Sequence, residues 1–270
     1  KEPNKKYPNN NPGGEPWVPN PAYTAWWQKD SKLSAPKNSN LKTVMDFSFF
    51  DKINTAKNEQ TETWFKGLDR IYNNFVYDFL YPNPASVLAF IENHDTDRFL
   101  GEGDNLPMLK QASTLLLTTR RIPQLYYGTE VMMNGVKSKS DGYVRKDFPG
   151  GWTGDATNAL TPAGRTKIQN ECYDFYKTIL NWRKGNDVIA KGSMVQFMVQ
   201  NGVYAYARQY EGKTIFVMLN GTDAETTVPL KFYKEILKDS KQGKDILSGK
   251  AITFGEELKM GPRESLVIEL

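Results

Sequence analysis

The run from Ser86 to Ile91 (SVLAFI) constrains the fold most, because its apolar side chains would project from both faces of an extended chain. A strand that is apolar on both faces is typical of a parallel sheet covered by helices on both sides. Polar residues follow at once as Glu92-Asn93-His94-Asp95, and His94 is the only histidine in the chain. The sequence therefore places side chains that could bind a ligand or take part in catalysis directly after a buried strand.

Strand-like runs alternate with helix-length segments over the first two thirds of the chain. In order these are a strand at 41–47, a helix at 61–80, a strand at 86–91, a helix at 104–119, a strand at 122–127 and a helix at 170–185. This alternation predicts a parallel α/β sheet with helical crossovers. Thr61 is a candidate N-cap, and Pro107 falls in a first helical turn, where proline is tolerated. The long loop at 128–166 is expected to be a functional lid or binding loop.

From about residue 188 the pattern changes to short runs that alternate apolar and polar positions. Asn201-Gly202 and Glu211-Gly212 are tight-turn signals between such runs. We therefore expect two domains, an α/β domain at 1–186 and an antiparallel β-sandwich at 187–270. Asn220-Gly221-Thr222 is a glycosylation sequon, although a turn explains the same residues and is the favoured interpretation.

Composition narrows the classes of function. The 35 basic and 31 acidic residues give a net charge of +4 and are interspersed, so we expect no nucleic-acid partner. No apolar run approaches the length of a membrane span, so no membrane association is expected. Cys172 cannot form an internal disulfide and is expected to be a core thiol. We expect no cofactor, because one histidine cannot make a zinc site, while structural calcium held by oxygen ligands stays open.

Four short motifs resemble the α-amylase family of glycoside hydrolases. Phe90 to Asp95 matches F-x-x-N-H-D, and Ile122 to Glu130 is similar to P-x-[IL]-Y-Y-G-x-E. Gly14-Glu15-Pro16-Trp17 resembles the family's G-E-x-W. The D-x-x-x-R stretch from Asp141 to Arg145 looks closest to the neopullulanase, cyclomaltodextrinase and maltogenic amylase branch.

The resemblance implies a fold in two parts, which are the second half of a (β/α)8 TIM barrel, strands five to eight, and an antiparallel β-sandwich. The family's G-x-R-x-D motif, which carries the nucleophile, is absent from the chain. Half a barrel would leave unpaired strand edges. We therefore expect the chain to be the C-terminal part of a longer enzyme, with the missing N-terminal half of the barrel as its partner. The chain does not start with Met, so we expect it to be a mature product or a fragment.

The resemblance also implies a set of site residues. Retaining glycosidases need two carboxyl groups across the scissile bond, one of them a nucleophile and the other an acid/base. By motif, Glu15 would be the acid/base, and Asp95 the further carboxylate that grips the distorted sugar. The residues expected to bind substrate are His94, Asn93, Arg98, Trp17 and Arg145. Arg98 would either orient Asp95 or pair with another carboxylate.

The expected activity is hydrolysis, with retention, of α-glucosidic bonds in starch-like glucans such as pullulan, cyclodextrins and maltooligosaccharides. Two alternatives stay open, a non-catalytic α-glucan-binding or assembly module and a transglycosylase of the same family. Resemblance to neopullulanases of Gram-negative bacteria favours a periplasmic location over the cytoplasm. A homodimer is also open.

Overall fold

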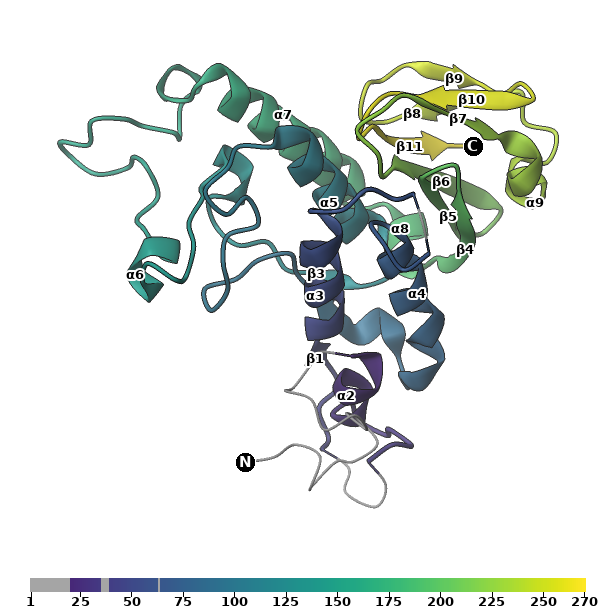
Figure 1. Ribbon diagram of the computed structural model, residues 1–270, viewed down its shortest axis with the longest axis horizontal. Helices are drawn as coiled ribbons and strands as arrows, with labels where there is room; N and C mark the ends of the chain where they lie inside the picture. Colours follow the sequence, from purple (N-terminus) through teal and green to yellow (C-terminus); the bar gives the residue numbers. More distant parts are fainter. Residues whose placement is uncertain (1–19, 35–38, 63) are drawn as a thin grey trace.

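A computed structural model describes residues 20–34, 39–62 and 64–270 of the chain (Figure 1). The described part begins with helices around a small parallel sheet and ends in an antiparallel sheet region. The α-helices are α2 (Pro21–Trp26), α3 (Phe47–Ala56), α4 (Asp69–Val76), α5 (Leu106–Thr118), α6 (Asp141–Val144), α7 (Lys167–Arg183), α8 (Asp187–Lys191) and α9 (Lys234–Leu237). Short 3-10 helices are η1 (Tyr77–Leu80), η2 (Pro84–Ser86), η3 (Thr129–Val131), η4 (Pro162–Gly164) and η5 (Leu230–Tyr233).

The first sheet is parallel, as the alternating pattern predicts, and the described residues give it the order β1-β2-β3. Its strands are β1 (Val44–Met45), β2 (Val87–Ala89) and β3 (Ile122–Pro123). In the central strand β2, Val87 and Ala89 point to one face and are fully buried, while Leu88 on the other face is partly exposed. The sequence predicted cover on both faces, and the described residues cover one face more completely than the other. Three strands do not close a barrel, so the TIM barrel stays an expectation. The strand predicted to lead to Glu15 lies outside the described residues.

The helix predicted at 61–80 is shorter than expected, because α4 spans only Asp69–Val76 before the 3-10 turn η1. Thr61 does not cap it; its hydroxyl accepts a hydrogen bond from the backbone of Leu68 at 2.8 Å. Gly67 has φ +54, and a Cβ there would meet the Thr61 hydroxyl at 2.2 Å. This close approach keeps the chain out of helical conformation before Asp69.

The sequence pattern also missed α3, which begins directly after β1. Asp46 caps this helix by accepting from the backbone N–H of Phe49 at 2.9 Å. The other predicted helices are confirmed as α5 and α7. Pro107 lies in the first turn of α5, and Gly185 follows α7 with φ +77.

A six-stranded antiparallel sheet with the order β4-β5-β6-β11-β8-β9 forms the C-terminal part. Its strands are β4 (Ser193–Gln200), β5 (Val203–Tyr210), β6 (Lys213–Asn220), β8 (Gln242–Asp245), β9 (Ala251–Thr253) and β11 (Ser265–Glu269). Both tight turns form as predicted. In each of them, Asn201-Gly202 and Glu211-Gly212, both residues have positive φ, as a type I′ hairpin turn requires.

Each face of this sheet packs on a different layer. One face joins helices α4, α5 and α7 in a single hydrophobic core through residues such as Tyr204, Tyr206 and Val217. The other face packs with α9 and with a small sheet of β7 (Thr226–Pro229) and β10 (Glu257–Met260). Figure 1 shows the sheet seated beside α5 and α8. The C-terminal sandwich therefore forms, and its six-stranded sheet also covers the helices of the first part.

Two further sequence expectations concern single residues. Cys172 is fully buried in the core, and burial raises the pKa of its thiol to about 12, so this cysteine is a core thiol as predicted. Asn220 is also fully buried, and its side chain donates to the carbonyls of Ala224 and Gly261. The sequon is therefore part of a structural turn, with its amide enclosed.

A buried ion cluster ties β3 to α3 and η1. The Arg121 guanidinium is fully buried and donates to Asp46 at 3.1 Å and to Asp78. It also lies over the rings of Phe75 and Tyr81. The cluster joins three segments that are far apart in the sequence, which are the start of α3, the stretch at 75–81 and the start of β3.

We predict that Arg121→Met lowers the free energy of unfolding by about 3–5 kcal/mol, because two buried carboxylates lose their partner. Urea unfolding measures the change. Lys191→Met, which removes an exposed ion pair with Asp187, should stay within about 0.5 kcal/mol of the unmodified protein. Equal stability of both variants would contradict a structural role for the cluster.

Candidate functional site

The candidate site begins where β2 ends. The chain continues through Phe90, Ile91 and Glu92, all buried, and then turns outward. At the turn the side chains of His94 and Asp95 are 62% and 59% exposed. Parallel strands commonly deliver functional groups at their carboxyl ends. The position of this pair therefore agrees with the sequence prediction.

Two contacts fix the Asp95 carboxylate, one to an imidazole and one to a guanidinium. One of its oxygens lies 3.2 Å from Nε2 of His94, and the other accepts from the Arg145 guanidinium at 2.9 Å. Arg145 also donates to the carbonyl of His94 at 2.8 Å, so it spans both residues of the pair. Three residues that the sequence singled out are thus in contact, although Arg145 is fifty positions away from Asp95.

Asn93 holds the turn from below. Its side-chain oxygen accepts from the backbone N–H of Asp95 at 2.8 Å, and its own N–H donates to the hydroxyl of Thr96. Asn93 is only 4% exposed, so its expected contact with substrate stays a prediction. Its contacts make it a positioning residue for Asp95.

The loop after β3 adds two further charged residues, Lys137 and Asp141, that the sequence analysis did not assign to the site. Lys137 donates through its side chain to the carbonyl of Asp95 at 2.9 Å and through its backbone to Asp97 at 2.6 Å. Asp141 pairs with both Lys137 and Arg145. The spacing from Asp141 to Arg145 was the available signal, because residues four apart lie on the same side of a helix; Asp141 begins α6 and Arg145 follows its last residue.

Beneath the turn lies a buried ion pair between Glu92 and Arg98. Arg98 is fully buried, and its guanidinium donates to Glu92 and to the carbonyls of Tyr127 and Val144. Its planar group also lies over the Tyr126 ring, 4.0 Å from the centroid. This arrangement joins the turn after β2 to both ends of the loop that carries Lys137.

Glu92 accepts from the backbone N–H of Phe99 and from the hydroxyl of Thr129. Burial raises the pKa of its carboxyl, while these hydrogen bonds and the charge on Arg98 act in the opposite direction. Glu92 was not predicted as a site residue; its place between a buried strand and Asn93 was the only signal.

The structure corrects the expected role of Arg98 in binding substrate. With no exposed surface, Arg98 cannot reach a ligand, and it pairs with a carboxylate other than Asp95. The alternative that it pairs with another carboxylate is confirmed. Glu15 and Trp17 lie outside the described residues.

The described ranges contain no group of three or more His, Cys, Asp and Glu side chains arranged to hold a metal ion. Within the same ranges, no helix has both the length and the apolar character needed to cross a bilayer.

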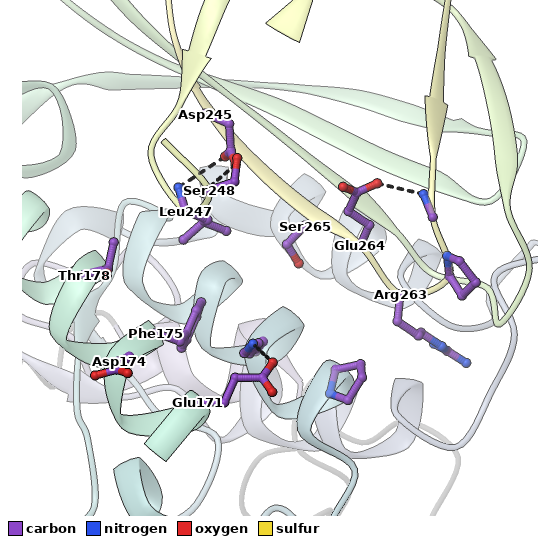
Figure 2. A pocket seen from close by; sticks show the side chains of 14 residues that line it. Glu171, Asp174, Phe175, Thr178, Asp245, Leu247, Ser248, Arg263, Glu264 and Ser265 are labelled. Carbon is purple, nitrogen blue, oxygen red and sulfur yellow. Dashed lines mark hydrogen bonds and ion pairs between the residues drawn. The ribbon is translucent and has the colours of Figure 1, made fainter. Parts of the chain in front are cut away.

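A separate cavity of about 620 Å³ lies between the two parts of the chain (Figure 2). Its walls come from α5, α7, the turn after β8 and the loop before β11. Figure 2 shows Glu171, Asp174 and Phe175 on the helix side, facing Glu264 and Arg263 from the sheet side. Of the predicted site residues that the structure describes, none lines this cavity.

The exposed pair can do defined chemistry. A carboxylate fixed at two oxygens can accept hydrogen bonds from hydroxyl groups and stabilise a developing positive charge. An exposed imidazole can donate or accept within the same small region. The turn therefore suits binding of a hydroxyl-rich ligand whose reacting centre becomes positive.

Comparison with known proteins gives the chain its class. A family model of the cyclo-malto-dextrinase C-terminal domain matches residues 194–269, which include β5, β6 and β11. An α-amylase of Niallia circulans is 28% identical over 226 residues, covering 81% of this chain and 38% of the amylase. A cyclomaltodextrin glucanotransferase of Thermoanaerobacterium thermosulfurigenes is 30% identical over 217 residues, covering 77% of this chain and 28% of the transferase.

Solved structures show the same fold. The α-amylase from Geobacillus thermoleovorans, crystallised with acarbose, superposes with a TM-score of 0.71 at 20% identity over 94% of this chain and 52% of that one. The cyclomaltodextrin glucanotransferase CldA has a TM-score of 0.66 at 20% identity, over 92% of this chain and 46% of that one.

The class is therefore that of α-amylase-like proteins with a C-terminal antiparallel sheet domain. The chain is related to the α-amylase family, and residues 194–269 resemble the C-terminal domain of cyclomaltodextrinases. The family resemblance predicted from the motifs is confirmed. The chain spans about a third of the length of these two curated relatives.

We predict that Arg98→Met lowers the free energy of unfolding by about 3–5 kcal/mol, because it leaves Glu92 buried without its cation. It should also speed proteolytic cleavage within 128–145, whose ends Arg98 holds through Tyr127 and Val144. Urea unfolding and limited proteolysis measure the two effects.

Lys139→Met is the matched control, because it removes an exposed pair with Glu102 in the same loop. It should change neither stability nor cleavage. A cleavage rate for Arg98→Met equal to that of the control would show that Arg98 does not hold the loop.

Proposed function

We propose that the chain supplies part of the active site of a retaining glycoside hydrolase that cleaves α-glucosidic bonds in starch-like glucans. The substrates would be α-glucans such as pullulan, cyclodextrins and maltooligosaccharides. The observation that carries the proposal is the exposed His94–Asp95 pair at the end of β2, with the Asp95 carboxylate fixed by Arg145 and its backbone by Asn93.

In this proposal Asp95 grips sugar hydroxyl groups while the ring distorts towards an oxocarbenium ion. The developing positive charge strengthens its interaction with a fixed carboxylate, so the stabilisation is larger in the transition state than in the bound substrate. His94 hydrogen-bonds the same sugar from the neighbouring position. Arg145, which is 40% exposed, orients Asp95 and contacts the ligand at the rim.

Glu15 completes the chain's share of the chemistry as the acid/base. A retaining mechanism needs this group and a nucleophile about 5–5.5 Å apart. The nucleophile would come from a companion segment with the first half of a barrel, which would also cover the open edges of the three-stranded sheet. The curated relatives are about two to three times as long as this chain, and their length supports such a segment.

The names of the relatives support the substrate class. The curated relatives include an α-amylase and cyclomaltodextrin glucanotransferases, and solved neighbours are described with acarbose, maltose and maltotriose. These names belong to those proteins. They favour an α-glucan as the ligand of the turn at Asp95.

We predict that Asp95→Asn in the complete polypeptide lowers kcat on maltooligosaccharides by about 10²–10³-fold or more, because a neutral amide cannot stabilise developing positive charge. Reducing-sugar release measures the rate. Asp104→Asn, an exposed carboxylate outside the site, should keep the unmodified rate. An Asp95→Asn rate equal to that of the control would remove the assignment.

Transfer of the glycosyl group is a second candidate function, because the relatives include several named glucanotransferases. The same residues would serve, and the acceptor would be a sugar hydroxyl in place of water. Product analysis at high acceptor concentration separates the two. Longer oligosaccharides as the main product would establish transfer, and shorter ones alone would establish hydrolysis.

A non-catalytic α-glucan-binding or assembly module is the third reading, supported by the missing nucleophile motif. Affinity for maltooligosaccharides without turnover, also with the companion segment present, would establish it. We further propose a periplasmic location, supported by the resemblance to neopullulanases, with the cytoplasm as the alternative. Cell fractionation tests the location.

A further inference from the structure

Helix α3 ends against the turn at 92–99, which carries the exposed pair of the candidate site. The helix begins at the buried ion cluster, because its N-cap Asp46 pairs with Arg121. At its other end the C-cap Lys57 keeps a helical conformation, and its side chain reaches the carbonyl of Phe99. The helix therefore connects the buried ion cluster to the turn of the candidate site.

Two side chains at this end of α3 hold the two ends of the turn. The Asn54 amide donates to the carbonyl of Ile91 at 2.9 Å, where the chain enters the turn. The Lys57 ammonium donates to the carbonyl of Phe99 at 2.5 Å, where the chain leaves it. The same ammonium donates to the side-chain oxygen of Asn54 at 3.0 Å, so the two residues form one unit. Asn54 and Lys57 together are named the α3 clamp.

The helix that carries the α3 clamp is packed against the residue before the turn. Asn54 also donates to the carbonyl of Phe50, one helical turn earlier, at 3.0 Å. The Phe50 ring stacks on Phe90 with the centroids 5.1 Å apart, and the Phe47 ring meets Phe90 edge-on at 5.2 Å. Phe90 is fully buried and directly precedes Ile91. The α3 clamp therefore acts on the turn from a fixed base.

Groups of the turn balance the charge on Lys57. Burial lowers the pKa of its ammonium, while the charges on Asp97 and Glu92 act in the opposite direction. The ammonium also lies over the Phe99 ring, 4.7 Å from the centroid. All three of these compensating residues lie within 92–99. A partly buried cation held by groups of a single turn favours one arrangement of that turn.

The α3 clamp acts on Asp95 through the backbone of the turn. Asp95 lies midway between the two clamped carbonyls, four positions after Ile91 and four before Phe99. The pair of Glu92 and Arg98 supports the same turn from the side of the following loop, whereas the α3 clamp supports it from the helix. Displacement of either end of the turn would therefore move the carboxylate that the turn presents.

From these contacts we infer that Asn54 and Lys57 are positioning residues for Asp95, because they fix both ends of the turn that presents its carboxylate. Both hydrogen-bonds that the Asn54 amide donates are to carbonyls of the protein, so it acts through the backbone and not on a ligand. A displacement of about 1 Å at a reacting group can lower a rate by about 100-fold. The consequence for catalysis rests on the proposed function, whereas the consequence for the turn does not.

The first test follows the imidazole of His94, the only histidine of the chain, by NMR of its ring C–H groups. In the complete polypeptide the loss of one signal in His94→Gln assigns it. Lys57→Met and Asn54→Leu each remove one half of the α3 clamp. Each should shift or broaden the His94 signal, because the imidazole contacts Asp95 on the released turn.

The second test measures kcat and KM of the same variants of the complete polypeptide on maltooligosaccharides. Both variants should lower kcat by about tenfold or more and leave KM within about twofold, because Asp95 acts more on the transition state than on bound substrate. Urea unfolding gives the folded fraction to which kcat refers. If Lys57→Met does not fold, Asn54→Leu carries both tests.

Lys52→Met is the matched control, because Lys52 is also a partly buried lysine of α3 and pairs with its neighbour Asp51 at 2.8 Å. It should keep the His94 signal and both kinetic constants. If the α3 clamp variants match this control in the His94 signal, or in kcat, the inference is overturned while the proposed hydrolysis stands.

If the unmodified polypeptide cleaves no maltooligosaccharide, the proposed function fails, and the His94 signal alone then decides the inference. A signal that moves in the α3 clamp variants and stays in Lys52→Met would support it. The same signal in all three variants would overturn it.

Discussion

The buried pair of Glu92 and Arg98 is the interaction on which the candidate site depends. Arg98 lies in the interior and donates at the same time to Glu92 and to the carbonyls of Tyr127 and Val144. A buried charge is tolerated only when paired and hydrogen-bonded, so the guanidinium imposes one arrangement on the segments around it. The turn that exposes Asp95 and the loop that carries Arg145 therefore share a common support.

The two parts of the chain also stabilise each other where they meet. The six-stranded sheet buries residues such as Tyr204 and Val217 against α4 and α5, so the helices of the first part and the sheet share a single core. Polar contacts add to it, including a hydrogen bond from the Gln111 amide to the carbonyl of Asn220 at 2.7 Å. Each part thus removes apolar surface of the other from water, which fixes the helices that stand behind the parallel strands.

Local signals in the sequence worked where the physical cause is local. The hairpin turns at Asn201 and Glu211 formed as predicted, because positive φ at successive positions is a property of a few neighbouring residues. The same reasoning failed between Thr61 and Asp69. There a close approach of Gly67 to Thr61, and a hydrogen bond from Thr61 to the carbonyl of Gly221, stopped a helix that periodicity favoured. Tertiary contact outweighed propensity, which is worth only a fraction of a kcal/mol per residue.

The sequence by itself determined the class of the elements, the order of the strands along the chain, the family resemblance and the position of His94 and Asp95 after a buried strand. Only the tertiary structure decided that Arg98 is interior, that Asn93 supports the turn, and that Lys137 and Arg145 come to Asp95 from a distant loop. Burial and long-range pairing depend on how separate segments pack against one another. That packing is a property of the whole chain, and no short motif contains it.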